Sequence, residues 1–194
     1  MSLAEKQIIL RIQNGKTEEY SYFLEHYSRE VFATVIRLLD NVQDAEEVTQ
    51  DAFVSAYQHI SDYRTEMPFG TWVCHIAYNR AISMLRKRER IPSQIKMDEN
   101  RLADISDEMV SDEFYNVQSC KMRLLETALS KISADDRALL YLFYQEDKSL
   151  KEIAYILGMD TSSQKSTTAL ATKIFRIRKK LYVLIKQEET DYER

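Results

Sequence analysis

The chain has 194 residues, of which 44% are hydrophobic and 30% charged, and it contains only 3 glycines, 2 prolines and 2 cysteines. Folds rich in β-structure use glycine and proline in their turns, so this composition predicts an all-α protein. Three scattered glycines form no phosphate-binding loop, and two cysteines form neither a disulfide framework nor a Cys-based metal site. No segment has the ~18 apolar residues that a membrane span requires. We therefore expect a cytoplasmic protein without a cofactor.

The net charge of −4 hides a segregation of charge along the chain. Residues 1–63 carry 5 basic and 11 acidic side chains, whereas residues 64–90 carry 6 basic and 2 acidic ones. Residues 91–120 are acidic again, with 2 basic against 7 acidic side chains, and residues 164–186 hold seven basic residues and no acid. The two basic segments can attract a polyanion, although basic residues that only solvate a helix face would give the same composition.

Residues 1–91 are expected to be a run of helices, and residues 44–60 carry its first strong helical signal. The apolar positions recur at steps of three and four and share one face: Ala45, Val48, Ala52, Ala56 and Ile60. Three acids share a different face at similar spacing: Asp44, Glu47 and Asp51. The pattern predicts a helix that is buried on one side and acidic on another.

Residues 69–90 form a second predicted helix, which combines aromatic and basic side chains. Its buried stripe is Val73, Ile76, Ala77, Ala81 and Met84, and Pro92 prevents it from running much further. Flat rings beside cations suit unpaired nucleic-acid bases, which stack on aromatic side chains after leaving a duplex. The alternative is that Phe69, Trp72 and Tyr78 anchor the core, and periodicity leaves both interpretations open.

Residues 92–117 are acidic and weakly periodic, which predicts a linker between two small helical domains. The helical pattern returns over residues 118–187 and is followed by a polar tail, residues 188–194. Within this second domain, Ser149 and Glu152 form an S-x-x-E capping box, and Gly158 stands where a left-handed residue ends a helix.

A last helix has an apolar arc of Leu170, Ile174, Ile177, Leu181 and Leu184. If it begins early, its opposite side carries Lys165, Thr168, Thr172, Arg176 and Lys179. A short capped helix, a glycine turn and a basic second helix are typical of a DNA-binding helix-turn-helix. An ordinary pair of packed helices would share much of this pattern.

The residues give little support to catalysis. The three histidines, His26, His59 and His75, have no Cys or acid at metal-ligand spacing, and Cys74 has no obvious activating partner. We therefore expect no catalytic residue, no metal site and no small-molecule substrate.

The motifs together resemble a bacterial RNA polymerase sigma factor of the extracytoplasmic-function (ECF) type, over nearly the whole chain. DAEEVTQDAFVSAYQHI (44–60) is similar to the family's core-binding segment, and FGTWVCHIAYNRAISMLRKRER (69–90) to the segment that melts and reads the −10 element. LSKISADDRALLYLFYQEDKSLKEIAYILG (129–158) and KIFRIRKKL (173–181) resemble the helix-turn-helix domain that reads the −35 element.

The resemblance implies roles for three groups of residues. Docking on the clamp helices of the polymerase's largest subunit is implied for Asp44, Glu47, Gln50 and Asp51. Contact with the −10 element is implied for Arg64, Phe69, Trp72, Asn79, Arg80, Arg86, Lys87, Arg88 and Arg90. Contact with the −35 element is implied for Ser166, Thr167, Thr168, Lys173, Arg176 and Lys179.

The implied partners are core RNA polymerase, through its clamp helices and flap, promoter DNA, and an anti-sigma factor. Such an inhibitor could clamp the two domains into a closed arrangement. The alternatives are a stand-alone helix-turn-helix regulator, which has no use for the acidic first-domain helix, and a helical adaptor that binds only proteins.

One segment departs from the family pattern. MDTSSQKSTTALAT separates Gly158 from Lys173, about six residues more than usual. Either the turn is longer or the recognition helix begins earlier, with a different register of DNA-facing residues.

Overall fold

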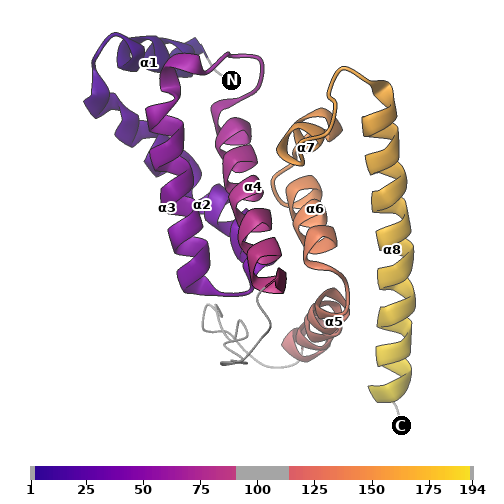
Figure 1. The fold of residues 1–194 in the computed structure, drawn as a ribbon. Helices are drawn as coiled ribbons and strands as arrows, with labels where there is room; N and C mark the ends of the chain where they lie inside the picture. Colours follow the sequence, from indigo (N-terminus) through magenta and orange to yellow (C-terminus); the bar gives the residue numbers. More distant parts are fainter. Residues whose placement is uncertain (1–2, 91–113, 193–194) are drawn as a thin grey trace.

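The computed structural model describes residues 3–90 and 114–192, and within these ranges every regular element is a helix (Figure 1). The first half of the chain, residues 3–90, comprises α1 (Leu3–Gln13), η1 (Thr17–Tyr20), α2 (Ser21–Leu39), α3 (Val42–Gln58), η2 (Ile60–Asp62) and α4 (Phe69–Arg90). The second half, residues 114–192, comprises α5 (Phe114–Ser130), α6 (Ala134–Tyr144), α7 (Leu150–Ile156) and α8 (Gln164–Tyr192). The all-α prediction is confirmed, and none of the described helices has the length and apolarity needed to cross a bilayer.

The element boundaries differ from the predicted ones at two places. Most of the predicted linker lies outside the described residues, and α5 begins at Phe114, four residues before the predicted return of helical structure. At the other end, α8 continues to Tyr192, through most of the segment predicted to be a polar tail. The extension of α8 is therefore made mainly of polar residues that showed no apolar periodicity.

The first half is a bundle in which α2, α3 and α4 pack against one another. Phe23 of α2 and Phe69 of α4 are completely buried, and their rings stack with centroids 3.9 Å apart. Ala45, Val48, Ala52 and Ala56 are buried on one face of α3, as predicted, and the fifth position, Ile60, is buried in η2, after the helix has ended. Each large side chain removed from water in this way contributes about 1.5–3 kcal/mol, which fixes α4 firmly against α2 and α3.

A close approach of backbone to side chain holds the start of α4. The ring of Tyr27 lies against Gly70, where a Cβ atom would stand 2.5 Å from two ring carbons. Any residue larger than glycine would have to displace that ring, whose hydroxyl donates a hydrogen bond to the buried Glu5 of α1.

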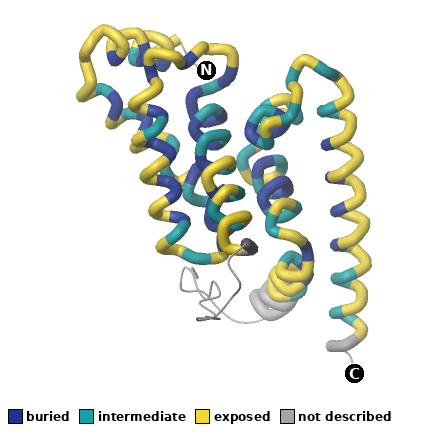
Figure 2. Tube along the Cα trace, in the orientation of Figure 1, coloured by how far each residue is buried: buried dark blue, intermediate teal, exposed yellow. Residues whose placement is uncertain are grey.

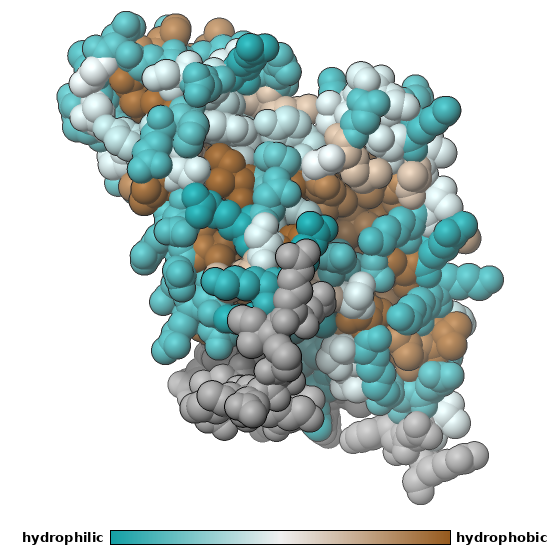
Figure 3. All heavy atoms as spheres, in the orientation of Figure 1, coloured by the Kyte–Doolittle hydropathy of each residue, from teal (hydrophilic) through white to brown (hydrophobic). Residues whose placement is uncertain are grey.

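In the second half, α7 begins with the predicted capping box: the Ser149 hydroxyl accepts from the Glu152 N–H, and the Glu152 carboxylate accepts from the Ser149 N–H. Gly158 follows with a φ of +69°, a left-handed conformation that glycine adopts without strain. The long α8 packs only one side against α5, α6 and α7, burying four residues of the predicted arc, Leu170, Ile174, Ile177 and Leu181. On the face drawn in Figure 3, a band of hydrophobic residues shows where α8 meets α6 and α7, and further patches lie over the first half of the chain.

The two halves of the chain lie in direct contact. Helix α6 packs against α2, and α7 packs against α4, so that α4 is covered from both halves. In Figure 2 buried residues line α4, α6 and α7, whereas the outer side of α8 is exposed along its length. The two halves therefore form a closed arrangement.

Candidate nucleic-acid interface

An aromatic cluster stands at the start of α4. The Trp72 ring lies 4.6 Å from that of Tyr63 and 5.6 Å from that of Phe69, measured between centroids. Tyr63 is buried, its hydroxyl donates to the Met67 carbonyl oxygen at 2.5 Å, and burial raises the pKa of this hydroxyl, which stays neutral. Trp72 is half-buried and keeps some surface for a base.

Phe69 lies elsewhere than its implied role requires. Its side chain is completely buried among Tyr20, Phe23 and Tyr63, so it has no surface to offer a nucleic acid in this arrangement. The structure thus places Phe69 in the core, as the interpretation of this ring as a core anchor predicted. There its ring packs against the ring of Trp72.

The basic residues of α4 lie along its exposed side, and two of them pair with acids of α3. Arg80 contacts Asp51 at 3.0 Å, and Arg88 contacts Asp44 at 2.7 Å. Three other cations, Arg64 before the helix and Arg86 and Lys87 within it, are exposed. Asn79 is exposed beside the His75 ring, with its amide nitrogen 3.1 Å from Nε2. The side chain of Arg90 lies outside the described residues.

The acidic face of α3 divides into exposed and enclosed members. Glu47, Gln50 and Asp51 are exposed, and the Asp51 side chain keeps 56% of its surface. Asp44 keeps only 17%, and one of its carboxylate oxygens is buried without a hydrogen-bond partner in the described part of the chain. Asp44 therefore joins the start of α3 to the end of α4, while Glu47 and Gln50 remain open to a partner and Asp51 is exposed but paired with Arg80.

The last helix resolves the question of register. It begins at Gln164, so the extra residues after Gly158 lengthen the helix at its start, as one of the two alternatives predicted. Its outward face forms a shallow groove lined by Gln164, Lys165, Thr168, Ala169, Thr172 and Arg176. Thr168 and Thr172 donate their hydroxyl protons to backbone carbonyl oxygens one turn earlier, which leaves oxygen lone pairs facing outward.

The six residues implied to contact the −35 element are not all on this groove. Thr168, Arg176 and Lys179 point outward, whereas Ser166 and Thr167 are half-buried. Lys173 is exposed but pairs with Asp136 of α6 at 3.1 Å. Sequence reasoning passed over Phe175 and Tyr182, which are 66% and 64% exposed. Helical spacing alone places both well away from the buried arc, so the signal was available.

Comparison with known proteins shows which family this chain is similar to. The Sigma-70 region 2 model matches residues 23–91. SigW of Bacillus subtilis, an ECF RNA polymerase sigma factor, is 25% identical over 171 residues, which cover 86% of this chain and 91% of that protein. The ECF RNA polymerase sigma-E factor of Escherichia coli is 23% identical over 181 residues, 91% of each protein.

Solved structures give the same fold. The sigma factor RpoE of Bartonella quintana, in a co-crystal structure with the anti-sigma factor NepR, matches with a TM-score of 0.65 and 20% identity, over 87% of this chain and 98% of that one. CnrH in complex with the cytosolic domain of CnrY matches with a TM-score of 0.64 and 18% identity, over 95% and 98%.

The match over residues 23–91, which takes in α2, α3 and α4 and their acidic and basic faces, identifies the class: the chain is a sigma factor. Because its named relatives align over about nine-tenths of both proteins, it is more particularly an ECF RNA polymerase sigma factor. The sigma factor interpretation is therefore favoured over a stand-alone helix-turn-helix regulator.

Proposed function

We propose that this sigma factor docks on core RNA polymerase through the exposed face of α3, opens the −10 element with α4 and binds the −35 element with α8. The polymerase contacts would be the clamp helices of the largest subunit and the flap. The protein would act in the cytoplasm, where polymerase and promoter DNA are, and would catalyse no reaction.

The observation that carries the proposal is that the acidic face of α3 meets the basic face of α4 along one edge. Asp51 and Arg80 stand 3.0 Å apart at that edge. A polymerase surface bound to Glu47 and Gln50 would therefore lie beside DNA held by Arg80, Arg86 and Lys87. Polymerase and promoter would then bind to adjoining faces of the same helix bundle, polymerase on α3 and promoter DNA on α4.

Opening of the duplex needs binding energy, because extruding a base costs a few kcal/mol. Stacking on an aromatic ring returns about 1–3 kcal/mol per base, and arginine and lysine contacts to phosphates add an electrostatic contribution. In the aromatic cluster of α4, Trp72 is the ring with surface left to stack on, since Tyr63 and Phe69 are buried. We therefore assign Trp72 the contact with an unpaired base.

Trp72→Ala tests this assignment. With core enzyme and a promoter library, the variant should form open complexes on the order of tenfold less than the unchanged chain, because one stacking contact is lost. Its affinity for core enzyme should stay the same. Tyr144→Ala, which removes a ring 50% exposed on α6, is the matched control. Absence of any open complex with the unchanged chain on every template would overturn the proposed function.

The outward face of α8 fits a duplex. Lys165, Arg176 and Lys179 make no ion pair with any described residue, so they are available to phosphates, and the Thr168 and Thr172 hydroxyls can meet base edges. Loss of one phosphate contact lowers the slope of log K against log salt by about 0.9. Lys179→Ala should show this change on −35 DNA, whereas Lys173→Ala, whose ammonium already pairs with Asp136, should show less. The reverse ranking would show that another face of α8 binds DNA.

An inhibitor is the remaining proposed partner. RpoE and CnrH were both solved as complexes, RpoE with an anti-sigma factor and CnrH with the cytosolic domain of CnrY. By analogy we propose that a protein inhibitor also binds this chain. Co-purification of a chromosomally tagged copy with a protein other than polymerase subunits would test it, and recovery of polymerase subunits alone would count against it.

A further inference from the structure

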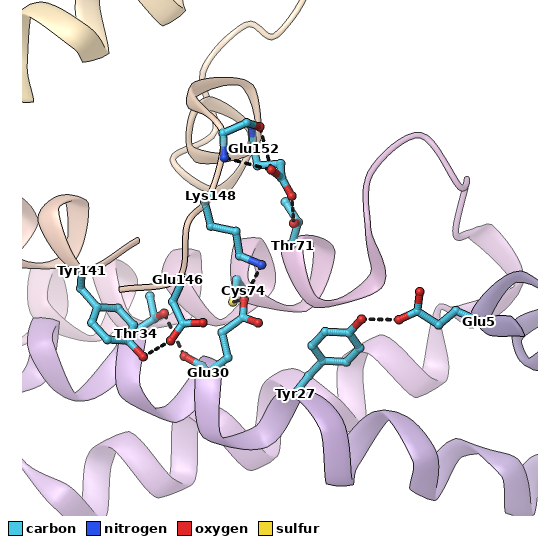
Figure 4. A network of polar contacts seen from close by, with 11 residues as sticks. Glu5, Tyr27, Glu30, Thr34, Thr71, Cys74, Tyr141, Glu146, Lys148 and Glu152 are labelled. Atoms are coloured by element: carbon cyan, nitrogen blue, oxygen red, sulfur yellow. Dashed lines mark hydrogen bonds and ion pairs between the residues drawn. The ribbon is translucent and has the colours of Figure 1, made fainter. Parts of the chain in front are cut away.

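A buried ion pair joins the two halves of the chain. Lys148, in the turn before α7, contacts Glu30 of α2 at 2.9 Å, and each side chain keeps only 13% of its surface (Figure 4). Cys74 of α4 lies beside them, with its sulfur 3.5 Å from the same carboxylate. Burial, followed by the charge of Glu30, raises the pKa of this thiol, so it remains a neutral donor. The cation of one half is thus enclosed by α2 and α4 of the other.

One stripe of α4 makes further polar contacts with the second half. The Thr71 hydroxyl donates to the Glu152 carboxylate at 3.0 Å, and Nδ1 of His75 lies 3.1 Å from the Ile156 carbonyl oxygen. Burial and the neighbouring Asp135 raise the pKa of Tyr78 to about 12, and its hydroxyl points at that carboxylate. Positions 71, 75 and 78 fall on one side of a helix, which is the side that meets α6 and α7.

A third group of contacts lies at the far end of α2. Arg137 of α6 donates to the Asp40 carboxylate at 2.5 Å, and the Arg37 guanidinium stands 3.7 Å from the centre of the Tyr141 ring. Contacts therefore extend from the end of α2 to the start of α4. Their number and spread distinguish this interface from a chance touching of two domains.

We propose that these contacts act as a latch that closes the free sigma factor upon itself. The latch comprises Glu30, Thr71, His75 and Tyr78 with Lys148, Glu152, Ile156 and Asp135, together with the Arg37–Tyr141 and Asp40–Arg137 pairs. The side of α4 next to its DNA-facing residues is covered in this state, and the cover is the chain's own second half.

Closure is incompatible with the contacts of both halves on one promoter, a step that rests on the proposed function. The −10 and −35 elements lie about 25 base pairs apart, which is about 85 Å of duplex at 3.4 Å per base pair. Helix α8 has 29 residues and is about 44 Å long. Because α8 packs on α7 and α7 packs on α4, the two DNA-facing helices cannot separate that far until the latch opens. Binding to core polymerase must therefore pull the halves apart, and closure lowers the apparent affinity in proportion to the open fraction.

Small-angle X-ray scattering of the free chain tests the latch directly. A closed chain of this length should have a radius of gyration near 16 Å, the value for one compact domain. Lys148→Met removes the cation but keeps the length of the side chain, leaving Glu30 buried and uncompensated. We expect that variant to expand by several ångströms. Replacing both Glu30 and Lys148 by Met removes both charges and should restore the compact form.

The matched control is Lys131→Met, which breaks an ion pair with Glu188 inside the second half. It should leave the radius of gyration unchanged. Far-UV circular dichroism establishes that each variant is helical, and if Lys148→Met fails to fold, Thr71→Val takes its place. This milder change removes one hydrogen bond to a carboxylate and should raise the open population on the order of tenfold. A compact Lys148→Met chain, or an extended unchanged chain, overturns the latch.

The scattering experiment is independent of the proposed function because it contains neither polymerase nor DNA. A chain that is compact when free but never opens a promoter would refute the proposed function and leave the latch standing. A chain that is extended when free yet supports transcription would refute the latch alone.

Discussion

The interior of the first half and the interface between the halves are built from different side chains. The interior is apolar and aromatic, with Phe23 and Phe69 stacked at its centre and both inaccessible to solvent. The interface contains the enclosed Glu30–Lys148 pair and the Thr71–Glu152 hydrogen bond. Both contacts also have an apolar part, because one hydrophobic cluster runs through both halves and includes Leu139 of α6 and Ile153 of α7. Separating the interface, unlike separating the interior, also returns enclosed charged groups to water. The interior can therefore separate only by unfolding, whereas the interface contains charged groups that water can solvate when the halves part.

This difference predicts two kinds of response to substitution. Changes in the interior should lower the free energy of unfolding of the first half. Changes in the interface should move the halves apart while each remains folded. The substitutions below test that distinction, from the largest expected effect to the smallest.

Phe69→Ala should lower the free energy of unfolding by about 3–5 kcal/mol, because it leaves a cavity among stacked rings. Thermal or urea denaturation followed by circular dichroism measures the loss. Phe175→Ala removes the same side chain from a position 66% exposed on α8 and should change stability by no more than about 0.5 kcal/mol. Equal losses in the two variants would mean that Phe69 is not the centre of the core.

Gly70→Ala should cost about 1–3 kcal/mol, since the added methyl group would stand 2.5 Å from two carbons of the Tyr27 ring. The control is the same change in a Tyr27→Ala background, where the ring is gone. There Gly70→Ala should cost nothing, because alanine is the better helix former. Denaturation of all four proteins gives the coupling energy, and additive effects would contradict the close approach.

The sequence predicted those parts of the fold that depend on local periodicity. The buried stripe of Ala45, Val48, Ala52 and Ala56 and the Ser149–Glu152 capping box follow from spacing within one helix, and both are confirmed. The interface followed from no such signal. Thr71, His75 and Tyr78 share a helical face, but spacing on one helix does not reveal which distant segment will meet that face.

The sequence likewise predicted some parts of the candidate site and not others. The α8 face of Lys165, Thr168, Thr172, Arg176 and Lys179 was given by periodicity once the helix start was assumed, and the structure puts that start at Gln164. For Phe69, composition gave two interpretations, and only three-dimensional packing placed the ring in the core. Ion pairs such as Arg88–Asp44 likewise depend on how α3 crosses α4, which no single-helix pattern contains.

Ser149→Ala should lower the stability of the second half by about 1 kcal/mol, because the N-terminal N–H groups of α7 lose their cap. It should also loosen the latch slightly, since Ser149 holds the Glu152 carboxylate that accepts from Thr71. Ser149→Thr keeps the hydroxyl and is the control in both denaturation and scattering. An alanine variant as stable as the threonine variant would show that the capping box contributes little.

The smallest expected effect is an opening of the latch in acid. Burial raises the pKa of Glu152. Hydrogen bonds from Ser149 and Thr71 and the charge of Lys148 together lower it by more than burial raises it, so the pKa of Glu152 lies below its ordinary value. A contact that lowers the pKa of a carboxylate stabilises the conformation in which the contact is made. This stabilisation is complete at pH values above the ordinary pKa of the carboxylate and is lost as the pH falls through the lowered pKa. Only the Thr71 contribution crosses between the halves, so only that part favours closure.

For Lys148 the sign is opposite. Burial lowers its pKa, but Glu30 raises it more, and the net pKa lies above the ordinary value. Its contribution to closure is therefore complete below about pH 10 and is lost only in stronger alkali. Glu152 and Lys148 should thus leave the radius of gyration constant between about pH 6 and 9, and loss of the Glu152 charge should raise it below about pH 5, with a smaller rise in Thr71→Val. A radius of gyration that does not rise below about pH 5, or that rises equally in the unchanged chain and in Thr71→Val, would contradict the role assigned to Glu152.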